Sequence, residues 1–221
     1  MKKIKYAIFD FDGTLADSIG GITKAVNETA KEEKIDKSYT REEVTKFVGN
    51  GAKVLFMRAF NVTEFDSKTT KLYELFMNYY ALYQLKEIEI YPNINDLLLY
   101  LNKNDVNIII YSNKPYDILV DCMANLFKEV KILKCFGYNN EFVAKPKIDG
   151  IMKYFSLNNY DINEAIYIGD SPVDVKFAKA LNIPSVACLY GYGDLKLIKE
   201  EKPTYSVKSG KELLQLFKAI L

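Results

Sequence analysis

The feature that most limits the possible folds is an alternation of short apolar runs with helical patterns. The apolar runs are bounded by polar or turn residues and lie at 5–11, 106–111, 165–168 and 185–189. Patterns with helical spacing lie beside them at 93–103, 115–128, 147–156 and 172–181. Because alternating strands and helices pack as a parallel sheet covered on both faces, we predict a doubly wound α/β fold.

The segment from residue 16 to residue 86 has a different pattern. Its apolar residues follow helical spacing, and it contains no convincing strand. A capping box of Thr40 and Glu43 opens one helix, which Gly49–Gly51 interrupts, and a long aromatic stretch follows at 66–83. We therefore predict a helical cap at 16–86, inserted after the first strand of a core formed by 1–15 and 87–221.

Composition argues against several kinds of partner. The 30 basic and 29 acidic residues are spread along the chain, so we expect no nucleic-acid partner. No apolar run approaches the roughly 18 residues of a membrane span, so we expect no membrane partner either. Cys122, Cys135 and Cys188 match neither a disulfide framework nor a zinc site. A cytoplasmic monomer or homodimer is expected.

Polar and charged residues follow four of the predicted strands. They are Asp10 and Asp12, then Ser112 to Lys114, then Lys145 and Pro146 after a short predicted strand at 141–144, and finally Asp170, Ser171 and Asp174. In an open parallel sheet, the ligand site lies beyond the carboxyl ends of the strands. These four clusters are therefore expected to meet in one pocket.

Such a pocket suits phosphoryl transfer. Asp10, Asp12 and Asp170 at about 4 to 5 Å would repel by up to roughly 4 kcal/mol per pair, so a cation is needed. The chain has no histidine, and carboxylate oxygens without imidazole or thiolate favour Mg²⁺. One of Asp10 and Asp12 can be a nucleophile while the other transfers protons. Ser112 and Lys145 suit the phosphoryl oxygens, so we predict an aspartyl-phosphate intermediate.

Four stretches of the sequence resemble the motifs of the haloacid dehalogenase (HAD) superfamily of phosphatases. They are DFDGTLADS, the YSN that ends at Asn113, Lys145-Pro146 and GDSPVD. The cap stretch FVGNGAKVLFMRAF, the stretches IYPNINDLLLYLNK and SNKP, and the terminal YGYG and KPTYSVKSGKELL are similar to the bacterial phosphoglycolate phosphatase branch. The resemblance covers the whole chain, implies a HAD-like Rossmannoid core, and matches the helical insert to the first-position cap of that superfamily.

The resemblance implies roles for individual residues. Asp10 would be the nucleophile and Asp12 the general acid and base, while Asp10, the Asp12 carbonyl and Asp170 would bind Mg²⁺. Ser112, Asn113 and Lys145 would hold the phosphoryl group, and Thr14, Ser171 and Asp174 would support the site. The substrate would be 2-phosphoglycolate or another small phosphorylated metabolite. Arg41, Lys53, Arg58 or the backbone of Gly49–Gly51 are candidates to meet its carboxylate.

Several alternatives remain open from the sequence. Ser112 and Asn113 could cap the helix that begins at Pro115, Lys145 could be an exposed loop cation, and Asp174 could serve only its own helix. A pyrophosphatase, a nucleotide phosphatase and a phosphomutase related to β-phosphoglucomutase would share the same core residues. Asp12 argues against a dehalogenase, which needs no acid there. The alternative outside enzymology is a phosphate-sensing binding module.

Overall fold

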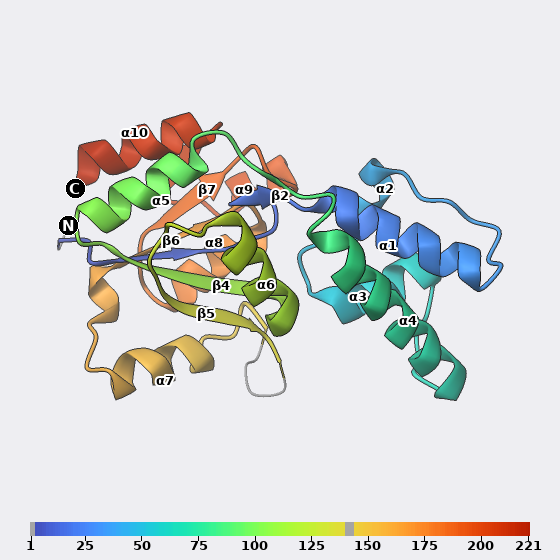
Figure 1. Cartoon of the computed structure of the whole chain (residues 1–221). Helices are drawn as coiled ribbons and strands as arrows, with labels where there is room; N and C mark the ends of the chain where they lie inside the picture. Colours follow the sequence, from blue (N-terminus) through green and yellow to red (C-terminus); the bar gives the residue numbers. More distant parts are fainter. Residues whose placement is uncertain (1–2, 140–143) are drawn as a thin grey trace.

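The computed structural model describes residues 3–139 and 144–221, and its centre is one parallel sheet (Figure 1). Within the described residues, the six strands lie in the order β5-β4-β1-β6-β7-β8. Their bounds are β1 Tyr6–Phe9, β4 Asn107–Pro115, β5 Ile132–Tyr138, β6 Ala165–Gly169, β7 Ser185–Cys188 and β8 Tyr205–Val207. The chain moves outward from β1 on one side and then on the other. This topology confirms the predicted doubly wound fold.

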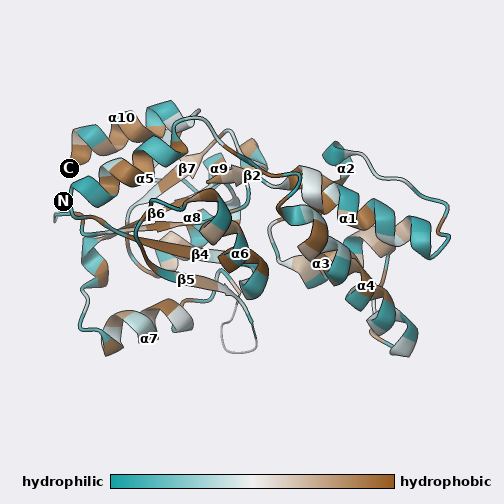
Figure 2. Cartoon of the chain, in the orientation of Figure 1, coloured by the Kyte–Doolittle hydropathy of each residue, from teal (hydrophilic) through white to brown (hydrophobic). Residues whose placement is uncertain are grey.

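Alternating side chains of the strands build two apolar layers. Ala7 and Phe9 face a cluster that includes helices α5, α6 and α10, whereas Tyr6 and Ile8 face α7 and α8. The helices of the core are α5 Ile94–Lys103, α6 Tyr116–Leu126, α7 Asp149–Leu157, α8 Pro172–Ala180, α9 Leu195–Glu200 and α10 Gly210–Ile220. Figure 2 shows that central strands such as β4 are largely hydrophobic and lie between helices with mixed surfaces. Both faces of the sheet are therefore buried.

Four helices form a separate body beside the sheet (Figure 1). They are α1 Ile19–Glu32, α2 Arg41–Thr45, α3 Ala52–Phe60 and α4 Ser67–Gln84. Phe56 of α3 lies at the centre of an aromatic cluster with Phe65, Tyr73 and Phe76, at ring-centroid distances of 5.1 to 5.9 Å. The aromatic stretch predicted from the sequence is therefore the packing core of these helices. We keep 16–86 as the proposed extent of the cap.

The structure corrects the sequence prediction in 16–86 and at 106–111, and its parallel sheet contains two strands that the sequence analysis does not predict, β5 and β8. The expectation of no strand in 16–86 is wrong, because β2, Ala16–Asp17, pairs with β3, Glu89–Ile90, where the chain passes between cap and core. The strand predicted at 106–111 continues to Pro115, with an irregular register against β5 after Tyr111. Residues 141–143 of the strand predicted at 141–144 lie outside the described residues.

The sheet order determines where a ligand site can form. Strand β1 lies between β4 and β6, so the residues that follow these three strands share one edge of the sheet. The helices of the cap stand over this same edge (Figure 1). Among the described residues, no helix is long and apolar enough to cross a membrane.

Candidate active site

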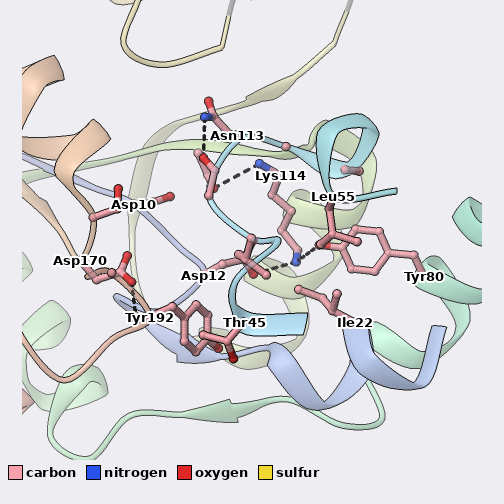
Figure 3. Close-up of a pocket in the computed structure, with 17 residues that line it drawn as sticks. Asp10, Asp12, Ile22, Thr45, Leu55, Tyr80, Asn113, Lys114, Asp170 and Tyr192 are labelled. Atoms are coloured by element: carbon pink, nitrogen blue, oxygen red, sulfur yellow. Dashed lines mark hydrogen bonds and ion pairs between the residues drawn. The ribbon is translucent and has the colours of Figure 1, made fainter. Parts of the chain in front are cut away.

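A cavity of about 70 Å³ lies between the carboxyl edge of the sheet and the cap. The core lines it with Asp10, Asp12, Ser112, Asn113, Lys114 and Asp170, and the cap lines it with Ile22, Val48, Gly49, Gly51, Leu55 and Tyr80. Figure 3 shows the carboxylates and Lys114 pointing toward the same space. Three of the four strand-end clusters that the sequence singles out thus line one cavity. The remaining cluster contacts a lining residue, because Lys145 pairs with Asp10.

Lys145 connects two carboxylates at the base of the cavity. Its ammonium lies 2.8 Å from Asp10 Oδ2 and 2.6 Å from Asp174 Oδ1, and it donates to the hydroxyl of Tyr167 at 2.9 Å. Burial acts to lower the pKa of Lys145, but the attraction of Asp10 and Asp174 outweighs it and the pKa is raised. Lys145 is therefore a buried, fixed cation and not an exposed loop lysine.

Asp10 follows β1, and its carboxylate is held by the backbone N–H of the next residue and by Lys145. The backbone N–H of Phe11 donates to Asp10 Oδ1 at 2.7 Å. Burial raises the pKa of Asp10 to about 6, and Lys145 and a hydrogen bond from Ser112 oppose this rise. The carboxylate is thus desolvated beside a cation, as an oxygen nucleophile requires.

Asp170 follows β6 and lies in a tight polar recess. The hydroxyl of Thr14 donates to its Oδ1 at 3.2 Å, and the N–H of Tyr192 donates to its Oδ2 at 2.7 Å. Gly13 has a φ of 80°, and any Cβ there would collide with this carboxylate, so glycine is required. Burial, followed by repulsion from Asp174 and Asp10, raises the pKa of Asp170.

The acidic cluster could hold a metal ion. Asp10, Asp170 and Asp174 each offer an oxygen, and these oxygens all lie within 4.8 Å of one another. Lys145 is the single cation that contacts this group among the described residues, which leaves an excess of negative charge in a buried place. A divalent cation with oxygen ligands would compensate that excess.

Asp174 has two structural partners in addition to its neighbours in the cluster. Its Oδ2 accepts from the N–H and the hydroxyl of Ser171, which completes a capping box at the start of α8. Its Oδ1 accepts from Lys145 and from the hydroxyl of Tyr167. Because each oxygen of Asp174 already accepts two bonds and has no lone pair left, Asp10 and Asp170, which accept fewer bonds, are the more available metal ligands.

Asn113, near the end of β4, connects two loops at the edge of the sheet. Its Nδ2 donates to the carbonyl of Gly49 at 3.0 Å, and its Oδ1 accepts from the N–H of Lys145 at 2.8 Å. Helix α6 receives no side-chain capping bond, so Ser112 and Asn113 do not serve as its cap. Asn113 thus joins the glycine loop of the cap to the loop that carries Lys145.

The sequence prediction did not assign a role to Lys114, although it lines the cavity. Its ammonium contacts Asp12 Oδ1 at 2.9 Å, and two residues of α4, Tyr80 and Gln84, also accept hydrogen bonds from it. The available signal was its place directly after Ser112 and Asn113 at the end of a buried strand. Its partners lie far away in the sequence, so no local pattern could identify them.

The structure does not bring the predicted selectivity residues to the cavity. Lys53 is exposed, with its ammonium over the ring of Phe65 at 4.2 Å. Arg58 donates to the carbonyl of Phe47 at 3.1 Å. Arg41 pairs with Asp17 at 2.8 Å. Among the described residues that line the cavity, the cap supplies no charged side chain, because these cations have other partners.

The chain combines a parallel sheet, an acidic cluster at the carboxyl edge of that sheet, a buried lysine and an inserted helical cap. Together these features define a capped α/β enzyme. Residues 7–188 match the family of haloacid dehalogenase-like hydrolases, and the chain belongs to that family. This match confirms the resemblance found in the sequence. The cluster of Asp10, Asp170 and Asp174 fits the active site of this family.

Individual relatives agree with this assignment. Phosphoglycolate phosphatase 1 of Pseudomonas aeruginosa is 32% identical over 225 residues, covering 95% of this chain and 78% of that protein. The crystal structure of a predicted phosphatase from Clostridium acetobutylicum is 28% identical, with a TM-score of 0.81 over 99% of this chain and 100% of that one. A predicted phosphoglycolate phosphatase from Haemophilus somnus has the same fold, with a TM-score of 0.87 at 22% identity over 98% of this chain and 99% of that one.

Proposed function

We propose that this chain is a Mg²⁺-dependent phosphomonoesterase that acts through an aspartyl-phosphate on Asp10. The observation that carries the proposal is the contact between Asp10 and Lys145, 2.8 Å apart beside the buried carboxylate of Asp170. An oxygen nucleophile, a fixed cation and a second carboxylate in one small cavity are the groups that phosphoryl transfer requires.

In the first half of the reaction, Asp10 forms the new bond. A carboxylate oxygen of Asp10 attacks phosphorus, and the bond from phosphorus to the leaving oxygen breaks. Asp12 gives its proton to that oxygen, so the alcohol leaves neutral. Ser112 and Asn113 donate to the phosphoryl oxygens. Lys145, whose ammonium already donates to Asp10, Asp174 and Tyr167, stabilises their charge as a fixed cation beside them.

In the second half of the reaction, Asp12 acts as a base. It removes a proton from a water molecule, the water oxygen bonds to phosphorus, and the bond between phosphorus and Asp10 breaks to release inorganic phosphate. Lys145 keeps its contact with Asp174 throughout and therefore remains an anchored charge rather than a mobile one.

Asp10 and Asp170, with the backbone carbonyl of Asp12, would hold the Mg²⁺ ion. The excess of buried carboxylates over ammonium groups supports this ligand set. When bound, the ion supplies positive charge that compensates the cluster and the phosphoryl oxygens. Thr14 would orient Asp170 through the hydrogen bond of its hydroxyl, and Ser171 would hold Asp174.

The substrate class we favour is a small phosphorylated acid, with 2-phosphoglycolate as the first candidate. Relatives named phosphoglycolate phosphatase support it, and so does a cavity of about 70 Å³, which suits a short substrate better than a nucleotide. The cap lines the cavity with apolar side chains, the glycine loop, and the hydroxyls of Thr45 and Tyr80. These two hydroxyls are bonded to the carbonyl of Arg41 and to Lys114, respectively. Backbone N–H groups of Gly49 to Gly51 are therefore the remaining candidates to meet a substrate carboxylate.

A substrate screen tests this proposal. The purified chain, supplied with Mg²⁺, is assayed side by side with 2-phosphoglycolate, pyrophosphate, sugar phosphates and nucleotides, and Asp10→Asn is assayed in parallel to exclude a contaminating phosphatase. We expect the highest kcat/KM for 2-phosphoglycolate. A preference for pyrophosphate or a sugar phosphate would overturn the substrate class, and release of phosphate from none of them would overturn the enzymatic proposal.

A further inference from the structure

Lys114 links the cap to the proposed acid and base of the core. Its ammonium lies 2.9 Å from Asp12 Oδ1, 2.9 Å from the hydroxyl of Tyr80 and 2.8 Å from Oε1 of Gln84. Asp12 belongs to the core, whereas Tyr80 and Gln84 belong to helix α4 of the cap. Figure 3 shows Lys114 between Asp12 and Tyr80. We infer that Lys114 is a positioning residue that orients Asp12 only when the cap is seated.

The contacts of Lys114 leave it no capacity to bind substrate. An ammonium group has three hydrogens to donate, and three acceptors at 2.8 to 2.9 Å take all of them. The side chain of Lys114 has 0% exposure although the residue borders the cavity. A fully donated, buried ammonium has one orientation, so it fixes the atoms that it contacts.

Asp12 depends on this single contact. Among the described residues, Lys114 is the only one that forms a hydrogen bond or an ion pair with the Asp12 carboxylate. Asp10 and Asp170, by contrast, also accept hydrogen bonds from backbone N–H groups. Without Lys114, the Asp12 side chain would be free to rotate away from the leaving oxygen.

The cap side of the link is rigid. Tyr80 is buried, and its ring stacks on that of Phe76 at a centroid distance of 5.7 Å. Gln84 is also fully buried, one helical turn further along α4. Two of the three acceptors of Lys114 therefore move with the cap as one body, so seating of the cap would set the direction of Asp12.

This inference rests on the proposed function, in which Asp12 protonates the leaving oxygen. A poor leaving group such as an alkoxide needs that proton, whereas p-nitrophenolate leaves without it. Misplacing Asp12 should therefore slow alkyl phosphates far more than p-nitrophenyl phosphate. A residue that only stabilises the fold would affect both substrates to the same extent.

The experiment compares kcat/KM for an alkyl phosphate, glycerol 2-phosphate, with that for p-nitrophenyl phosphate, using the full chain with Mg²⁺. The parameter kcat/KM reports formation of the aspartyl-phosphate, the step in which the leaving oxygen is protonated. For Lys114→Met, we expect about a 10- to 100-fold loss with the alkyl phosphate, because general acid catalysis is worth about 10²- to 10⁴-fold, and a loss below about 3-fold with the aryl ester. Lys179→Met, which removes an exposed lysine paired with Glu201, is the matched control. It should leave kcat/KM unchanged for both substrates.

Two further variants separate the possible outcomes. Asp12→Asn should show the same preference for the aryl ester, and Lys114→Met added to it should change the ratio of the two substrates little. One outcome is that Asp12→Asn prefers the aryl ester but Lys114→Met lowers kcat/KM for both substrates equally. That outcome overturns the inference about Lys114 while the proposed function stands. If Asp12→Asn shows no preference, Asp12 is not the acid, and the proposed mechanism fails with it.

Tyr80→Phe tests the link to the cap and replaces Lys114→Met if that variant does not fold. It removes one acceptor of the ammonium and keeps the ring that packs against Phe76. We expect the same change in the ratio of the two substrates at a smaller size, about 2- to 5-fold. An unchanged ratio in a folded Tyr80→Phe protein would overturn the role of the cap.

Discussion

The carboxylate of Asp174 lies 2.6 Å from the ammonium of Lys145, and both side chains are almost fully buried, at 1% and 2% exposure. Two charges removed from water to this extent stabilise the fold only as a pair, and either one alone is costly. The contact therefore links the stability of the protein to the geometry of its active site, since Lys145 is also the partner of Asp10.

Replacing Asp174 with Asn should destabilise the protein and impair turnover. We expect the free energy of unfolding to fall by about 3 kcal/mol. This value is at the lower end of the range for breaking a buried ion pair, because Asp10 still faces Lys145. Urea denaturation measures this loss. Glu201→Gln, which breaks an exposed pair of 2.8 Å with Lys179, should cost at most about 1 kcal/mol. Equal losses in the two variants would contradict the argument.

The Asp10→Asn variant should lose all turnover and keep its fold. The amide has nearly the size of the carboxylate but is not a nucleophile, so no aspartyl-phosphate can form. Steady-state assays with 2-phosphoglycolate, together with the urea midpoint, measure the two properties. Repeated turnover by protein whose mass excludes deamidation would show that Asp10 is not the nucleophile.

Mg²⁺ should stabilise the protein more at pH 7.5 than at pH 5. Burial raises the pKa of Asp10 from its ordinary 3.8 to about 6 in the metal-free protein. Between these values, the folded state binds more protons than the unfolded chain, so the contribution of Asp10 to stability falls as the pH rises through the window. A cation must displace those protons, and its binding is therefore weakest at the acidic end.

Thermal unfolding measures this effect without a substrate. At a Mg²⁺ concentration about 100-fold above Kd, the gain is about 2.7 kcal/mol, or roughly 5 to 10 °C in Tm, and we expect it at pH 7.5 but a smaller gain at pH 5. Asp170→Asn, which removes a proposed ligand, should show little gain at either pH. A gain independent of pH, or full gain in Asp170→Asn, would argue against this metal site.

The site residues that can be predicted from the sequence are those that belong to a short local pattern. Asp10 and Asp12 follow an apolar run directly, and Ser171 and Asp174 form a capping box within four residues. Lys114 carries no such mark, because its partners Asp12 and Gln84 lie 102 and 30 positions away. Its role depends on how the cap packs on the core, which no window of sequence contains.

The same limit explains what the fold prediction missed. Strand β5 at the edge of the sheet is only partly buried over most of its length and includes Lys134 and Gly137, so its sequence lacks the apolar run of a central strand. Central strands such as β1 and β6 are buried throughout and were identified from their apolar runs. In the cap, the charge of Arg58 and its place about two helical turns after the VGNG break predict a substrate contact, whereas the direction of its side chain depends on the tertiary structure.

The final prediction concerns Arg58, which contacts the glycine loop rather than the cavity. Its guanidinium donates to the carbonyl of Phe47. With the side-chain amide of Asn50 oriented so that its oxygen faces Arg58, that oxygen also accepts from the guanidinium at 2.9 Å. Arg58→Ala should therefore loosen the loop that ends at Gly51 and lower kcat/KM by about 3- to 10-fold, the value of one to two modest hydrogen bonds. The loss should be equal for 2-phosphoglycolate and for p-nitrophenyl phosphate, which has no carboxylate.

Lys53→Ala is the matched control, because Lys53 is an exposed cation of the same helix that lies over Phe65 and away from the loop. It should leave kcat/KM for both substrates within about 2-fold of the parent value, since an exposed cation over an aromatic ring contributes only about 0.5 to 1 kcal/mol, and to the fold rather than to the site. A loss in Arg58→Ala confined to 2-phosphoglycolate would mean that Arg58 reaches the substrate carboxylate when the cap closes. Equal losses would leave recognition of the carboxylate to the backbone of the glycine loop.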